Sequence, residues 1–143
     1  MTAPKSNAER LRKLYEAFDF GGAEAAGQLI DETFDPEVEF NPLEAGEVGG
    51  RTYRGRDGVL AFFGEMHDAV EEVRYESPQF HSVGDDLVVV FTRLVGTERD
   101  TAVPMRQDLS LVYEFLDGRA RCVTAYDSPA EALEAAARGH ADA

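Results

Sequence analysis

The sequence predicts a single α+β domain, because helical patterns fill its first half and strand patterns fill most of its second half. Its 143 residues suit one domain with a buried core. No internal repeat or linker-like segment divides the chain. We therefore treat residues 1–143 as one domain and expect an ordered core over residues 8–137.

The first helix is expected over residues 8–20, where apolar residues recur at the i, i+3, i+4, i+7 spacing of an amphipathic helix. These positions are Leu11, Leu14, Tyr15 and Phe18. Gly21 and Gly22 are expected to end this helix. A second short helix is expected over residues 23–33, and it must end before Pro36 because proline disfavours a helical residue before it.

A short strand is expected over residues 38–40, followed by Pro42 and a glycine-rich loop over residues 42–50. Residues 51–54 indicate another brief strand. A third helix is expected from residue 55 to residue 72, because one of its faces is strongly apolar. That face carries Val59, Phe62, Phe63, Met66 and Val70.

Four strands are expected next, over residues 73–83, 87–95, 103–116 and 119–127. A turn over residues 84–86 joins the first two strands. Asp117 and Gly118 form a dipeptide typical of two-residue hairpins, so the last two strands are expected to pair. A short C-terminal helix follows, with Ser128 and Glu131 as a capping box and proline between them at the first helical position.

The charge disfavours two classes of partner. With 28 acidic and 14 basic residues, the net charge of −14 repels phosphate backbones and anionic lipid, so we expect neither nucleic acid nor membrane as a partner. No apolar run approaches the roughly 20 residues that cross a bilayer. The first residues lack the apolar core of a signal peptide, and the single Cys122 suits a reducing compartment, so we expect a cytoplasmic protein.

Five stretches resemble the SnoaL-like polyketide cyclases, within the nuclear transport factor two-like superfamily. They are LYEAF at 14–18, FDPEVEF at 34–40, YRGRDGV at 53–59, YEFLDGR at 113–119, and YD with EALEAA at 126–136. The resemblance implies a curved antiparallel sheet wrapped around three N-terminal helices, which together form a cone with an internal pocket. It does not imply one activity, because this fold serves cyclases, isomerases, dehydratases, epoxide hydrolases and proteins without known chemistry.

Two carboxylates that the resemblance implies for isomerases are replaced in this sequence. The base before the proline that follows the first strand is Asn41 here, and the acid on the strand before the closing hairpin is Leu111. The tyrosine of the first helix falls at Leu14, with Tyr15 one residue away. Isomerase chemistry of that type is therefore disfavoured, because both the general base and the oxyanion hole are missing.

The last strand offers one acid in place of the cyclase carboxylate. The resemblance puts that carboxylate seven residues past Gly118, at Ala125, and the nearest acid is Asp127. Because strand side chains repeat every two residues, Asp127 could face the same cavity near its rim and act as the catalytic acid. The alternative is that Asp127 only leads into the helix cap at Ser128. A catalytic Asp127 requires burial beside apolar side chains.

Three further polar positions lie on the long strands. Alternation turns Arg106 and Asp108 outward, as a surface or interface ion pair, while Gln107 faces inward and either orients a ligand or bonds a neighbour. His81 is a second candidate general base by its ordinary pKa, although no carboxylate partner can be named for it and a structural role is the alternative.

The expected ligand is a small hydrophobic molecule, with no metal and no cofactor. The pocket residues are expected to be Phe18, Phe40, Asn41, Phe63, Met66, Met105, Gln107, Leu111 and Ala125. Two functions stay open: a cyclase, isomerase or lyase-type enzyme acting on a polyketide- or steroid-like metabolite, and a non-catalytic binding or interaction module. We also expect a homodimer through the outer sheet face, on which alternation places Leu94 and Val112.

Overall fold

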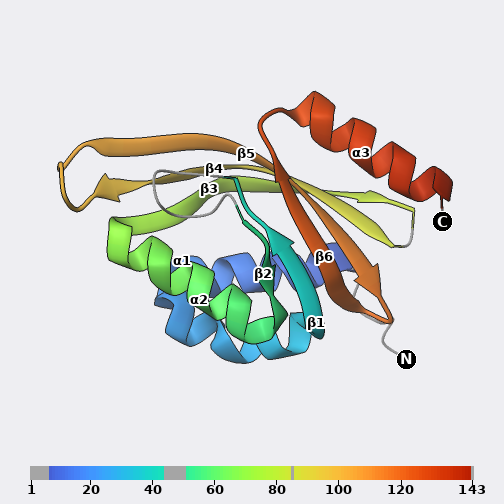
Figure 1. The fold of residues 1–143 in the computed structure, drawn as a ribbon, viewed down its shortest axis with the longest axis horizontal. Helices are drawn as coiled ribbons and strands as arrows, with labels where there is room; N and C mark the ends of the chain where they lie inside the picture. Colours follow the sequence, from blue (N-terminus) through green and yellow to red (C-terminus); the bar gives the residue numbers. More distant parts are fainter. Residues whose placement is uncertain (1–6, 44–50, 85, 143) are drawn as a thin grey trace.

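One six-stranded sheet organises the protein, with the strand order β2-β1-β6-β5-β4-β3 (Figure 1). The computed structural model describes residues 7–43, 51–84 and 86–142. Its strands are β1 (Phe34–Asn41), β2 (Tyr53–Arg54), β3 (Val70–Val83), β4 (Leu87–Glu98), β5 (Pro104–Leu116) and β6 (Arg119–Tyr126). The neighbouring pairs are antiparallel, as predicted, except that β1 runs parallel to β6.

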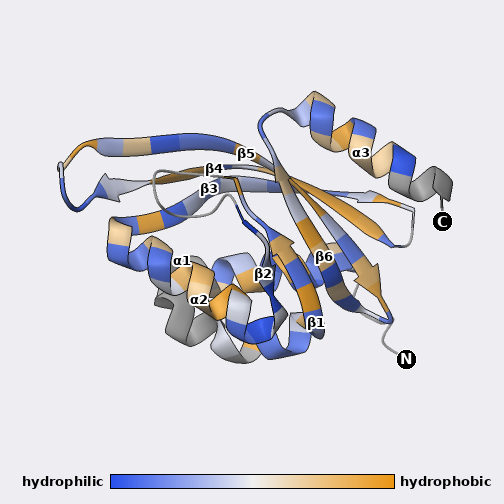
Figure 2. Ribbon diagram, viewed as in Figure 1, coloured by the Kyte–Doolittle hydropathy of each residue, from blue (hydrophilic) through white to orange (hydrophobic). Residues whose placement is uncertain are grey.

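Helices cover both faces of this sheet. The helices α1 (Asn7–Thr33) and α2 (Gly55–Ala69) lie on one face, and α3 (Pro129–Asp142) lies on the other (Figure 1). Figure 2 shows both apolar and polar residues along β6, where the buried residues Ala120, Val123 and Ala125 stand among exposed or partly exposed neighbours. The α+β class and the curved sheet around N-terminal helices are therefore confirmed.

The prediction of two helices before β1 was wrong, because α1 is one continuous helix of 27 residues. A glycine in a helix interior costs only about 1 kcal/mol relative to alanine. Packing at both ends of α1 outweighs that local cost, since Leu11 and Ile30 are fully buried. The sheet therefore wraps around two N-terminal helices and not three. The side chain of Phe18 lies outside the described residues.

Strand β3 contains two β-bulges. Its pairing with β4 shifts by one residue between Glu71 and Arg74, and again between Glu76 and Gln79. Each extra residue exchanges the inward and outward faces of the strand that follows it and bends the strand. Between the two bulges, the side chains that point inward are therefore those that would point outward if β3 were unbroken.

Both bulges contain a non-glycine residue in the left-handed region of backbone conformation. Glu72 has a φ of 53° and Ser77 a φ of 45°. For an L-residue this conformation costs roughly 1–2 kcal/mol. The surrounding sheet holds two residues in this unfavourable conformation within six positions. This distinguishes that part of β3 from the other long strands.

The apolar residues form two clusters, one on each face of the sheet. The larger cluster fills the space between the sheet and the two helices α1 and α2. The smaller one packs Ala132 and Ala136 of α3 against Leu87, Val89 and Val112. Val112 is thus covered within its own chain.

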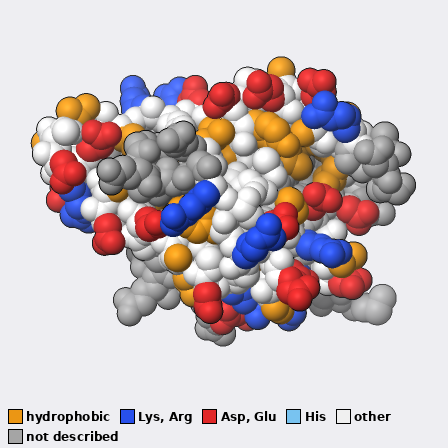
Figure 3. Space-filling model, in the orientation of Figure 1, with side chains coloured by type: hydrophobic (Ala, Val, Ile, Leu, Met, Phe, Trp, Pro, Cys, Tyr) orange, Lys and Arg blue, Asp and Glu red, His pale blue; other side chains and the backbone are white. Residues whose placement is uncertain are grey.

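Leu94 belongs to the inner cluster and is 3% exposed, so its assignment to the outer face was wrong. The homodimer stays a prediction, without Leu94 and Val112 as its support. On the face visible in Figure 3, acidic and basic side chains are interspersed and do not form one large patch of a single sign. In the described part of the chain, no helix is long and apolar enough to span a membrane.

The two local sequence signals near the C-terminus are confirmed. Asp117 and Gly118 both have positive φ values, 52° and 82°, as a two-residue hairpin turn requires. A Cβ at Gly118 would lie 2.7 Å from the guanidinium of Arg10, which donates a hydrogen bond to the Gly118 carbonyl at 3.1 Å. In α3, the Glu131 backbone N–H donates to the Ser128 hydroxyl at 3.2 Å, which is the predicted N-cap.

We predict that Ser128→Ala lowers the free energy of unfolding by about 1 kcal/mol, because a backbone donor of the first turn of α3 loses its acceptor. Urea or thermal unfolding measures the change. Ser128→Asp is the matched control, since its carboxylate can accept the same bond and should keep most of the stability. Coincident unfolding curves for parent and Ser128→Ala would contradict the role of this cap.

Candidate functional site

The interior of the cone holds two small adjoining cavities. The first is lined by Leu14, Tyr15, Phe34, Phe40, Phe63, Tyr75, Leu111 and Tyr113. The second is lined by Phe40, Pro42, Leu43, Phe62, Met66, Tyr75, Leu94, Gln107, Leu109, Leu111 and Ala125. Each has a volume of about 20 Å³, which is room for about one water molecule. They share three lining residues, so together they form one interior site in two compartments.

A pair of tyrosines is the polar feature of the first cavity. Tyr15 comes from the inward stripe of α1, and Tyr113 comes from the inward face of β5. Their hydroxyl oxygens lie 2.7 Å apart, which is the distance of a short hydrogen bond. Tyr15 also packs against two aromatic rings of β3, Tyr75 at 5.0 Å and Phe80 at 5.4 Å between ring centroids.

Burial keeps both phenols neutral. It raises the pKa of Tyr15 well above its ordinary value of 10.0, and the neighbouring Tyr113 raises it further. Burial also raises the pKa of Tyr113, against a smaller opposing effect of its hydrogen bond with Tyr15. One hydroxyl proton is used between the two oxygens, so the pair has one proton left to donate to a third oxygen. This is the kind of group that polarises a carbonyl.

Most of the predicted pocket residues do face this interior. Phe40 and Leu111 line both cavities, and Phe63 lines the first. The residues Met66, Gln107 and Ala125 line the second. Met105 is half-buried at the far end of β5, where it packs against the core and borders a groove on the surface. It therefore lies outside both cavities.

The two family positions that were counted from sequence both point inward. Leu111 and Ala125 are cross-strand partners in the β5–β6 ladder, and both line the second cavity. Both positions therefore face the interior, as expected, and neither carries a carboxylate. Among the described residues that line the two cavities, none is a carboxylic acid, a lysine, an arginine or a histidine.

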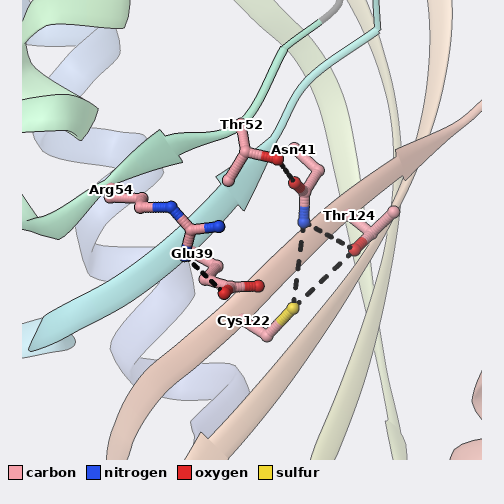
Figure 4. Close-up of polar contacts among 6 residues, drawn as sticks. All are labelled: Glu39, Asn41, Thr52, Arg54, Cys122 and Thr124. Atoms are coloured by element: carbon pink, nitrogen blue, oxygen red, sulfur yellow. Dashed lines mark hydrogen bonds and ion pairs between the residues drawn. The ribbon is translucent and has the colours of Figure 1, made fainter.

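Asn41 of β1 bonds to β6 and to the residue that precedes β2, and it does not line either cavity. Its side-chain oxygen accepts a hydrogen bond from the Thr52 hydroxyl at 2.6 Å, and its amide nitrogen donates to the Thr124 hydroxyl at 3.4 Å (Figure 4). The same nitrogen lies 3.9 Å from the Cys122 sulfur. Both the oxygen and the nitrogen of the amide thus form hydrogen bonds to neighbouring segments of the sheet. The structure therefore gives no support to the predicted contact between Asn41 and a ligand.

Cys122 lies in the same polar cluster, beside the ion pair of Arg54 and Glu39 at 2.7 Å (Figure 4). The thiol is half-buried, and burial raises its pKa. A raised pKa leaves little reactive thiolate at neutral pH, in agreement with the inert thiol expected from the sequence.

Neither predicted catalytic residue lies in the interior. Asp127 is exposed at the bend between β6 and α3, so the burial that its catalytic role requires is not found. His81 is exposed on β3, where its ring lies 5.3 Å from that of Phe91. Arg106 and Asp108 are exposed, as alternation predicts, but Asp108 pairs with Arg93 at 2.8 Å and not with Arg106.

Sequence reasoning missed the tyrosine pair and Tyr75. Helical spacing already turned Tyr15 inward, and strand alternation turned Tyr113 inward. A buried phenol needs a hydrogen-bond partner, so two inward tyrosines in one small core were a usable signal. Tyr75 gave no such signal, because its direction depends on the bulges of β3.

We predict that Tyr15 and Tyr113 make stability fall steeply in alkali. Their folded pKa values exceed the unfolded value of about 10, so above about pH 10 the folded state binds more protons than the unfolded state. The free energy of unfolding then decreases as pH rises, by up to about 1.4 kcal/mol per pH unit for each phenol. Urea unfolding at several alkaline pH values should give a shallower slope for the double variant Tyr15→Phe/Tyr113→Phe. Equal slopes would show that the pair titrates normally.

Comparisons with known proteins agree with the fold. No curated protein matches the chain. An NTF2-like protein of unknown function from Burkholderia pseudomallei superposes with a TM-score of 0.71 at 23% identity, over 92% of this chain and 97% of that one. A candidate polyketide cyclase from Pseudomonas putida gives 0.69 at 15% identity, over 92% and 98%.

A third similar structure is that of TerC co-crystallised with polyporic acid. It superposes with a TM-score of 0.70 at 23% identity, over 92% of this chain and 98% of that one. The model of the SnoaL-like domain matches residues 11–123, which is most of the chain. The family predicted from the sequence is confirmed, and this protein belongs to the SnoaL-like domain family.

Proposed function

We propose that the protein binds a small, neutral, apolar molecule in the interior of the cone, with an oxygen atom of that molecule accepting a hydrogen bond from the Tyr15–Tyr113 pair. The observation that carries this proposal is the 2.7 Å hydrogen bond between two buried phenols in a cavity whose other described lining consists of aliphatic and aromatic side chains. A few placed polar groups on apolar walls are typical of ligand sites.

The lining sets the chemistry of the ligand. A charged molecule would lose its hydration without meeting an opposite charge, because the walls formed by the described residues carry no ionisable group other than tyrosine. The aromatic walls suit a flat ring, and the pair supplies a donor, so a ketone or quinone oxygen fits it. The two cavities are small at rest, so binding requires side chains of the lining to move.

The family supports a metabolite of polyketide or steroid type as the natural ligand. Candidate polyketide cyclases share the fold, and TerC was co-crystallised with polyporic acid. Gln107 offers a second polar contact in the other cavity. It faces the same side of β5 as Tyr113 and lies six residues away, or roughly 20 Å along the strand. A ligand that reaches both contacts must therefore be long.

The first test uses acetophenone and ethylbenzene, which differ in whether a carbonyl or a methylene follows the ring. Binding is measured by NMR shifts of the side chains that line the cavities. The double variant Tyr15→Phe/Tyr113→Phe should weaken the binding of acetophenone about fivefold more than the binding of ethylbenzene. This factor corresponds to the loss of one hydrogen bond of ~1 kcal/mol. An unchanged ratio of the two dissociation constants would contradict the anchor, and the absence of binding by the parent would contradict the site.

A second candidate function is a cyclase- or isomerase-type enzyme, and the same tyrosine pair favours it. A hydroxyl proton held at the bottom of an apolar cavity would stabilise an enolate oxygen formed from a bound ketone. The two exposed candidates, Asp127 and His81, are too poorly placed to serve as the base for such a step. The binding function is therefore the better supported of the two.

Enolisation of a bound ketone distinguishes an enzyme from a binding protein. We expect that the parent protein does not accelerate exchange of the acetophenone methyl protons for deuterium in D₂O, because the described lining supplies no general base. Proton NMR follows the exchange directly. Acceleration that is lost in Tyr15→Phe/Tyr113→Phe would instead establish the enzyme and would call for a base elsewhere in the chain.

A further inference from the structure

Three residues line both interior cavities, and one of them differs from the other two in its place in the sheet. Phe40 and Leu111 belong to strands inside the sheet and are each 5% exposed. Tyr75 belongs to the edge strand β3 and is only partly buried. Tyr75 therefore lines both compartments from the edge of the sheet, whereas the other two residues line them from inside it.

The inward direction of Tyr75 depends on the two bulges of β3. Val70 faces the inner core before the first bulge, and an unbroken strand counted from it would turn residue 75 outward. The first bulge reverses the phase, so that Val73 and Tyr75 face inward. The second bulge reverses it again, and Phe80 becomes the next inward residue.

Both bulges hold a non-glycine residue in a strained conformation, and together they reverse the phase for only a few residues. Bulges that re-aim a side chain are common beside ligand sites, and backbone strain tends to persist where it serves a function. Here the side chains that are re-aimed are Val73 and Tyr75. Only Tyr75 lines the cavities, and its ring lies 5.0 Å from that of Tyr15.

We propose that Tyr75 is the residue that determines the length of ligand accepted by the interior site. Its side chain lines both the cavity of the Tyr15–Tyr113 pair and the cavity of Gln107. A one-ring ketone then needs other side chains of the lining to move but leaves Tyr75 in place, whereas a longer flat ketone requires the Tyr75 ring to turn aside. The inference rests on the proposed binding function, and it adds which residue restricts the ligand.

The test compares acetophenone with the two-ring ketone 2-acetylnaphthalene, using the ratio of their dissociation constants. Tyr75→Ala joins the two compartments and should shift this ratio toward 2-acetylnaphthalene by at least about tenfold. Tyr75→Phe keeps the ring and should leave the ratio close to that of the parent. Tyr126→Ala is the matched control, because it makes the same truncation on the outer face, where Tyr126 packs in the cluster with α3.

Tyr75→Leu provides a second variant that retains apolar volume, in case Tyr75→Ala does not fold; it should shift the ratio in the same direction. Binding of 2-acetylnaphthalene by either variant but not by the parent would also support the proposal. A ratio unchanged in a folded variant, while the parent binds acetophenone, would overturn the role of Tyr75 and leave the binding function intact. Failure of every form to bind either ketone would overturn both.

Discussion

The burial of two phenols in an apolar interior is the constraint on which the site depends. Tyr15 and Tyr113 are far apart in the sequence, and each would leave a polar oxygen without a partner if the other were absent from the interior. Their hydrogen bond fixes α1 against β5. It also places a hydrogen-bond donor in the first cavity. The aromatic and aliphatic walls around it then decide which molecules can approach that donor.

Local sequence signals were sufficient where structure is determined locally. The Ser128 cap, the turn at Asp117 and Gly118, and the inward alternation along β5 all appear as expected, because each depends on a few neighbouring residues. Gly21 and Gly22 led to the wrong prediction of a helix end. Their cost to helix stability is small compared with the free energy gained by burying residues at both ends of α1. Counting from Gly118 correctly placed Ala125 inside the cone.

The site itself was only partly accessible from the sequence. Six of the nine predicted pocket residues line the interior, since core positions and pocket positions coincide in this fold. The direction of Tyr75 follows from two bulges whose residues, Glu72 and Ser77, are not glycines and therefore give no warning in the sequence. The hydrogen bond between Tyr15 and Tyr113 joins two segments that are far apart in the sequence. The position of Asp127 beyond the end of β6 depends on where the strand stops, and strand ends are the least predictable feature.

The central claim is that the Tyr15–Tyr113 pair donates a hydrogen bond to a ligand oxygen inside the cone. Buried tyrosine hydroxyl protons that exchange slowly with water can be observed directly by proton NMR, with Tyr15→Phe and Tyr113→Phe assigning the resonances. We predict that saturating acetophenone shifts one of these hydroxyl resonances downfield, while ethylbenzene does not. Hydroxyl resonances that stay in place while acetophenone perturbs only residues outside the two cavities would contradict the account.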